Sequence, residues 1–174
     1  DGLFFTQRYG RTVCVPSMRP VLAWLILWDD RIRVKAIEIC PEVLIQGGDP
    51  SQLPISVRKM MLRSLCDHYA KKEVIFVSLD WSDVKRFAAP ELAPVVRTLY
   101  SEHSDHPEIC SLLFKVTWLG KISACSDLVL DYAKSNKGYS SALSYAINAV
   151  GELCSKEEQE ILLVEYLADR SFTD

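Results

Sequence analysis

Long apolar runs and a large net charge are both missing from this sequence. The longest uninterrupted apolar run, residues 21–28, is far shorter than the roughly 20 residues that a membrane-spanning helix requires, and no signal peptide is visible. The formal charge is only -3, so no global field attracts the chain to nucleic acid or to an anionic membrane. We therefore expect a cytoplasmic protein with no membrane partner. The first residue is Asp rather than Met, which suggests a piece of a longer polypeptide.

Motifs that would hold a cofactor are also missing. The six cysteines form no C-x-x-C pair and are scattered, mostly within apolar helical patterns, which favours buried free thiols in a reducing compartment. The pair Gly47-Gly48 precedes Asp49-Pro50 and lacks the Lys and the Ser or Thr of a phosphate-binding loop. A helix end followed by a turn explains it better, so we predict no nucleotide, metal or other cofactor.

The composition that is present is typical of a folded protein, with 49% hydrophobic and 25% charged residues. The charge is unevenly distributed, because residues 1–35 carry a net +3 and the residues from Glu152 onward carry a net -5. Solvated helix faces give such a pattern. The alternative is contact with neighbouring segments of opposite sign.

The N-terminal part predicts a β-hairpin followed by a helix. Residues 3–7 and 11–15 are β-prone, and Gly10 between them suits a turn that requires positive φ. Because two strands alone are barely stable, the hairpin must lean on the first helix or on a further domain. Ser17 is expected to cap that helix, which is apolar on nearly all sides and is therefore predicted to be central and covered.

The rest of the chain reads as helices that pack in pairs. Residues 30–53 predict a helix pair that turns back on itself, with Asp30 as the cap and Gly47-Gly48 at the end. Residues 73–80 are predicted to be extended or loop. The further helices are expected at residues 54–72, 83–89, 90–100, 107–119, 124–135, 139–153 and 156–168.

A weak internal repeat supports this arrangement. Residues 127–132 and 161–166 match in register at a spacing of about 34 residues, which lies in the range of two-helix repeats. No single pair could bury its apolar face alone. Stacking of the pairs is therefore required.

Two sets of residues resemble a known family. The pattern Asp30-x-Ile32-Arg33-x-x-Ala36 resembles the D-x-[VI]-R-x-x-A opening of a HEAT-like helix, and residues 56–58 echo it one unit later. Residues 15–25, 41–54 and 90–94 are similar to helical regions of large bacterial NACHT-type (STAND) NTPases. That family typically carries F-x-H-x-S-F-x-E-F-L-A-A after its winged-helix part. The comparable positions here are Ser17, Met18, Val21, Leu22 and Ala23, with Pro16 and Pro20 in place of polar residues and aliphatic residues in place of the aromatic ones.

The resemblance implies an organisation and a role. Residues 1–16 would be the tail of an upstream winged-helix-like domain, and residues 17–174 a HEAT-like helical-repeat domain that follows a nucleotide-binding module. Such a domain would be the sensor or regulatory region of a larger signalling ATPase, of a kind used in defence against phage. Its partners would be other domains of the same polypeptide or another protein.

Three short motifs contain residue types that perform chemistry in enzymes. Cys66 and His68 are the types of a thiol nucleophile and its base, but helical geometry favours Cys66 in the core with His68 outside. The loop at residues 102–106 contains two histidines that could bind a metal, although a solvated connection is the simpler interpretation. Residues 80–83 contain two carboxylates that could act as acid and base, or equally as helix caps.

Taken together, these patterns predict an all-α, irregular HEAT-like stack of antiparallel helix pairs with a short N-terminal β-hairpin. The favoured function is non-enzymatic protein interaction, with Trp81, Arg58, Lys59 and Arg63 as the candidate surface. The other tryptophans are expected in the core: Trp24, Trp28 and Trp118.

Two alternatives remain open at this point. The first is a nucleic-acid-binding solenoid that would use Arg58, Lys59 and Arg63 with Lys71 and Lys72. The second is an enzyme that would use Cys66 and His68, or the loop from His103 to His106.

Overall fold

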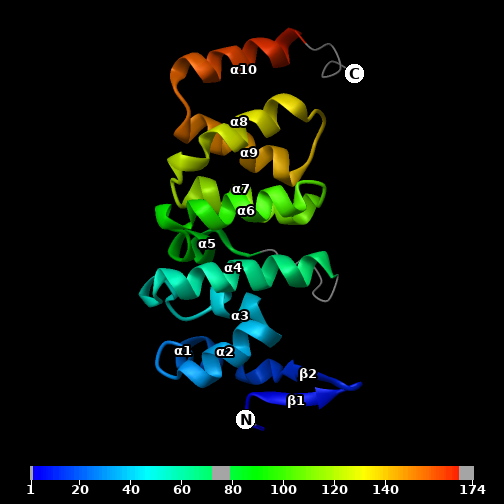
Figure 1. Cartoon of the computed structure of the whole chain (residues 1–174), viewed down its shortest axis with the longest axis vertical. Coiled ribbons are helices and arrows are strands. Elements are labelled where there is room, and N and C mark those ends of the chain that lie inside the picture. The colour runs from blue at the N-terminus through cyan, green and yellow to red at the C-terminus, as the bar shows by residue number, and fades with distance from the viewer. Residues whose placement is uncertain (1, 72–78, 169–174) are drawn as a thin grey trace. The chain divides into compact units, whose positions relative to one another are not determined.

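The computed structural model describes residues 2–71 and 79–168 (Figure 1). These residues are mostly helical, with one two-stranded antiparallel sheet, so the predicted all-α class with an N-terminal hairpin is confirmed. The chain divides into two compact units, Asp1–Ala88 and Ala89–Asp174. The first unit contains the hairpin and five helices, and the second contains the other five helices of the described part.

The hairpin is a pair of four-residue strands at the start of the first unit. Strands β1 (Phe5–Arg8) and β2 (Arg11–Cys14) are antiparallel, and the turn between them places Tyr9 and Gly10 at φ values of 50° and 75°. Two left-handed residues match the twist of a tight hairpin, so the prediction for Gly10 is confirmed. The support comes from the second helix, because Lys35 Nζ lies 5.1 Å from the centre of the Phe5 ring.

The first helix corrects two expectations. The 3-10 helix η1 (Pro16–Met18) leads directly into α1 (Arg19–Leu25), so Ser17 lies inside a turn and makes no capping hydrogen bond. The helix is also not covered on all sides. Trp24 and Trp28 were expected in the core, but they are 56% and 80% exposed. Only one side of this segment is buried, and both tryptophans lie on the other side. The buried residues are Leu22, Ala23 and Ile26.

The predicted helix pair is present as α2 (Asp30–Ile39) and α3 (Pro41–Gln46). Its cap is Asp29 rather than Asp30, since the Asp29 carboxylate accepts hydrogen bonds from the backbone N–H groups of Arg31 and Ile32 at 2.9 and 3.2 Å. After α3, Gly48 is left-handed with φ 61° as expected, whereas Gly47 is extended.

Three further elements complete the first unit. They are η2 (Pro50–Gln52), α4 (Ile55–Ala70) and α5 (Trp81–Phe87). The predicted end of α4 near Lys71 is confirmed. Helix α5 begins two residues earlier than expected because Asp80 caps it, so Trp81 is its first residue and does not lie in a loop. The segment predicted to be extended, residues 73–80, lies outside the described residues except for its last two.

The second unit is a set of helices around α7. Its elements are η3 (Pro90–Leu92), α6 (Ala93–His103), α7 (Pro107–Leu119), η4 (Ser123–Cys125), α8 (Ser126–Ser135), α9 (Ser141–Leu153) and α10 (Lys156–Ala168). The predicted bounds of α7 and α10 are confirmed. Helices α8 and α9 each begin two residues later than expected, because a 3-10 turn precedes α8 and Ser140 caps α9.

Helix α7 forms the centre of this unit, and its residues 109–117 are all buried. Phe114 contacts Tyr100 and Tyr132 at ring-centre distances of 5.5 and 4.6 Å, in the tilted geometry that aromatic pairs favour. Trp118 is half-buried and lies 6.3 Å from Tyr145, close to its expected core position.

Candidate functional site

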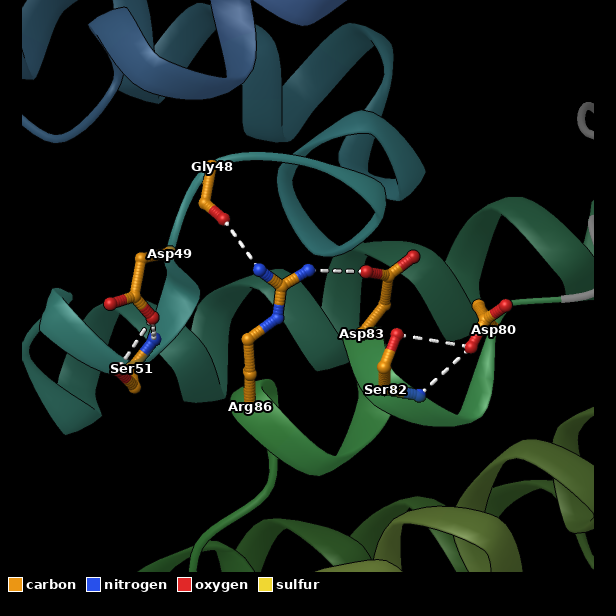
Figure 2. Close-up of polar contacts among 7 residues, drawn as sticks. All are labelled: Gly48, Asp49, Ser51, Asp80, Ser82, Asp83 and Arg86. Carbon is orange, nitrogen blue, oxygen red and sulfur yellow. Dashed lines mark hydrogen bonds and ion pairs between the residues drawn. The ribbon is translucent and has the colours of Figure 1, made fainter.

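Two motifs that the sequence singled out meet at Arg86 (Figure 2). One guanidinium nitrogen of Arg86 donates to the carbonyl oxygen of Gly48 at 3.1 Å, and the other contacts the Asp83 carboxylate. This contact ties α5 to the turn after α3 within the first unit. It holds two segments about forty positions apart in the sequence.

The carboxylates at this junction serve as caps. Asp49 accepts hydrogen bonds from the N–H and the hydroxyl of Ser51 at 3.2 and 2.6 Å, and Asp80 accepts from the N–H of Ser82 at 2.9 Å (Figure 2). The hydrogen bond from the Ser51 hydroxyl is the main cause that lowers the pKa of Asp49. Of the two carboxylates at residues 80–83, the capping interpretation is confirmed for Asp80, whereas Asp83 is paired with Arg86.

The predicted interaction surface is only partly assembled. Trp81 is 52% exposed, while Arg58 is half-buried and donates from its guanidinium to the carbonyl oxygen of Phe87 at 3.0 Å. That bond fixes the end of α5, so Arg58 has a structural role within the unit. Lys59 and Arg63 are half-buried on α4. Of the further basic residues named for nucleic acid, Lys71 is exposed and Lys72 lies outside the described residues.

The candidate catalytic pair is placed as the simpler interpretation predicts. Cys66 is fully buried, and His68 is half-buried with its Nδ1 lying 2.7 Å from the carbonyl oxygen of Ser64. That contact requires a proton on Nδ1, because a carbonyl oxygen can only accept. The Cys66 sulfur therefore lies in the core, as the simpler interpretation predicted.

The histidine loop also packs locally. His106 Nδ1 lies 3.1 Å from the Glu108 carboxylate, and the Cys110 thiol donates to the carbonyl oxygens of His103 and Ser104 at 3.7 and 3.5 Å. Burial raises the pKa of the Cys110 thiol to about 11. Among residues 2–71 and 79–168, no group of three His, Cys, Asp or Glu is placed to hold a metal ion.

One polar hollow of about 490 Å³ lies in the first unit between β2, α2 and α4. Its volume lies in the range of small-molecule sites, and cations, a carboxylate and an imidazole line it together. Sequence reasoning missed it, because its residues come from three separate elements. The lining residues are Arg11, Thr12, Val13, Lys35, Glu38, Ile39 and His68.

Two exposed apolar surfaces stand out. The first, which we name the α1 face, consists of Val21, Trp24 and Trp28 and is 51 to 80% exposed. At 100° per residue these three side chains lie within about 60° of one another, on the side of the helix opposite its buried residues. Beyond α1 the chain continues in a tighter turn, since the N–H groups of Leu27 and Trp28 donate to the carbonyl oxygens of Trp24 and Leu25 at 3.1 and 3.0 Å. Trp28 therefore stays close to this side of the helix.

The second surface, which we name the α10 face, consists of Ile161, Leu163, Val164 and Leu167 and is 52 to 77% exposed. Leu162 is the buried apolar residue of this helix, and the Tyr166 hydroxyl donates to the carbonyl oxygen of Ala133 at 2.6 Å. Next to this face is an apolar groove of about 280 Å³ between α9 and α10. Its lining residues are Ile147, Val150, Gly151, Gln159, Leu162, Leu163 and Tyr166.

Comparison of the chain with protein-family models, with curated proteins and with solved structures gives no match. In the part of the chain that the structure describes, each helix is too short or too polar to cross a bilayer.

Proposed function

We propose that this chain is a non-enzymatic, HEAT-like helical-repeat scaffold whose function is to bind protein. In this proposal its helix pairs stack as an irregular solenoid. It serves as the sensor or regulatory region of a larger NACHT-type (STAND) signalling ATPase. The resemblance at residues 30–36 and 15–25 is the basis for the family.

The observation that supports a binding role is the α1 face. Large apolar side chains that are exposed together on one side of a helix are uncommon on monomeric proteins and mark interaction sites. Trp24 and Trp28 dominate this face, and tryptophan is the residue type most enriched in interface hot spots. Trp81, with Lys59 and Arg63, is proposed as a second contact of the same kind.

The test is a comparison of three baits in extract of the cells that contain this protein. Quantitative mass spectrometry should find a protein that the wild-type chain retains and that the Trp24→Ala, Trp28→Ala double variant loses. Met60→Ala is the matched control, since Met60 is 50% exposed on α4 and its loss should leave retention unchanged. Equal retention by all three baits would contradict the proposal.

A further inference from the structure

The two units of the chain carry opposite charge. Residues 1–88 contain thirteen Lys and Arg against ten Asp and Glu, a net +3, whereas residues 89–174 contain seven against thirteen, a net -6. Opposite fields favour encounter between the first unit of one molecule and the second unit of another. They disfavour encounter between two like units.

The exposed apolar faces have the same distribution. The α1 face belongs to the positive unit and the α10 face to the negative unit. Four glutamates and one lysine lie on α10 itself, and they are Lys156, Glu157, Glu158, Glu160 and Glu165. An apolar surface with an acidic surround matches a partner that offers apolar side chains in a basic field.

Helix α10 carries apolar residues on more than one side. A helix that closes a stack carries a polar outer face, because that face meets water. Helix α10 instead has Leu162 on the side that packs onto its own unit. On the side away from Leu162 it has four exposed apolar residues together with the exposed Glu157 and Glu160. It therefore has a second apolar side. The groove between α9 and α10 adjoins that side at Leu163 and offers a hollow for an apolar side chain.

From these observations we infer that the α1 face of one molecule docks onto the α10 face and groove of a second copy. The contact joins two different surfaces, so it is heterologous. The inference uses the surfaces of the proposed function and names a second copy as the partner.

The test is sedimentation velocity on the full 174-residue chain from about 1 to about 200 µM. The wild-type chain should associate as its concentration rises, and its association should weaken roughly tenfold between about 50 and about 500 mM NaCl, because salt screens the opposite charges. A chain that stays monomeric throughout, or association that salt leaves unchanged, overturns the inference.

Two face variants make the test specific. Trp24→Glu with Trp28→Glu blocks the α1 face, and Val164→Glu with Leu167→Glu blocks the α10 face. All four side chains are more than half exposed, so both variants should keep the wild-type circular dichroism spectrum. Each alone should be monomeric, whereas Met60→Glu should associate like the wild type.

Mixing the two variants gives the decisive result. Each variant retains the face that the other lacks, so an equal mixture should form a complex of two molecules and stop there. If the mixture remains monomeric, or if either variant still associates alone, the inference is wrong. A monomeric wild-type chain would leave the bait comparison as an independent test of the proposed function.

Discussion

At the scale of single residues, Gly48 shows how one position can fix a turn. Its φ of 61° is left-handed, and a Cβ added there would lie 2.3 Å from the carbonyl oxygen of Ala23. Gly48→Ala should therefore lower the free energy of unfolding by at least about 2 kcal/mol, since neither the backbone conformation nor the close approach tolerates a side chain.

The matched control is Gly151→Ala in α9. A Cβ at Gly151 meets no atom within 4 Å and φ is not positive, so alanine should stabilise the helix by about 0.5 to 1 kcal/mol. Urea unfolding followed by circular dichroism measures both changes. A cost at Gly48 no larger than about 0.5 kcal/mol would mean that α1 and the turn are not in close contact.

The ion pair between Arg97 and Asp127 predicts a pH dependence. Arg97 donates to the Asp127 carboxylate at 2.5 Å, and this hydrogen bond lowers the pKa of Asp127 below its ordinary value of 3.8. A depressed pKa contributes stability above the unfolded-state pKa, and this contribution is lost as the pH falls through the folded-state value. Because both side chains are largely exposed, solvent screening limits it to less than about 1 kcal/mol.

Asp127→Asn should therefore be less stable than the wild type at pH 7, and the difference should vanish near pH 2. Thermal unfolding at both pH values measures this change. Asp131→Asn on the same helix is the control and should stay within about 0.5 kcal/mol of the wild type. If Asp127→Asn is destabilised relative to the wild type by the same amount at pH 2 as at pH 7, the loss of the carboxylate charge is not the cause.

At the scale of elements, the start of α9 provides a matched pair of neighbouring serines. The Ser140 hydroxyl accepts a hydrogen bond from the N–H of Leu143 at 3.1 Å, whereas Ser141 is the exposed first residue of the helix. Ser140→Ala should cost about 1 kcal/mol of unfolding free energy, because a buried helix loses its cap. Ser141→Ala should be close to neutral. Equal effects of the two changes on urea unfolding would show that the cap contributes nothing.

The sequence predicted elements better than it predicted their surroundings. Helices α7 and α10 begin and end where their patterns indicated, because proline or serine with glutamate marks each start. The surroundings of α1 were predicted wrongly for a physical reason. An apolar segment has no polar stripe to show which side faces water, so the sequence could not indicate that Trp24 and Trp28 point outward.

The candidate site shows the same limit. The cap at Asp80 was predictable, because it depends on a residue two positions away. The contact of Arg86 with Gly48 and that of Arg58 with Phe87 join residues far apart in the sequence, so local pattern gives no signal for them. The periodicity of apolar residues predicts which side of a helix is buried, but it does not predict which segment packs against that side.

At the scale of the whole molecule, the absence of a phosphate-binding loop leads to a prediction about ATP. A ligand that binds only the folded state at 100 times its dissociation constant stabilises that state by about 2.7 kcal/mol. For a chain of this length such a gain raises the melting temperature by roughly 5 to 10 °C. If the chain is a regulatory scaffold without a nucleotide module, then about 1 mM Mg-ATP should leave its melting temperature unchanged to within about 1 °C.

Differential scanning fluorimetry with Mg-ATP, Mg-ADP and Mg-GTP measures this, with a colorimetric phosphate assay on the same samples. The four tryptophans supply the intrinsic signal, and Trp24 and Trp28 are too exposed to report core melting. Trp118, which packs on Tyr145 in the second unit, is the better reporter. A stabilisation of several degrees by one nucleotide, or phosphate release above the buffer control, would place a nucleotide site on this chain and contradict the scaffold proposal.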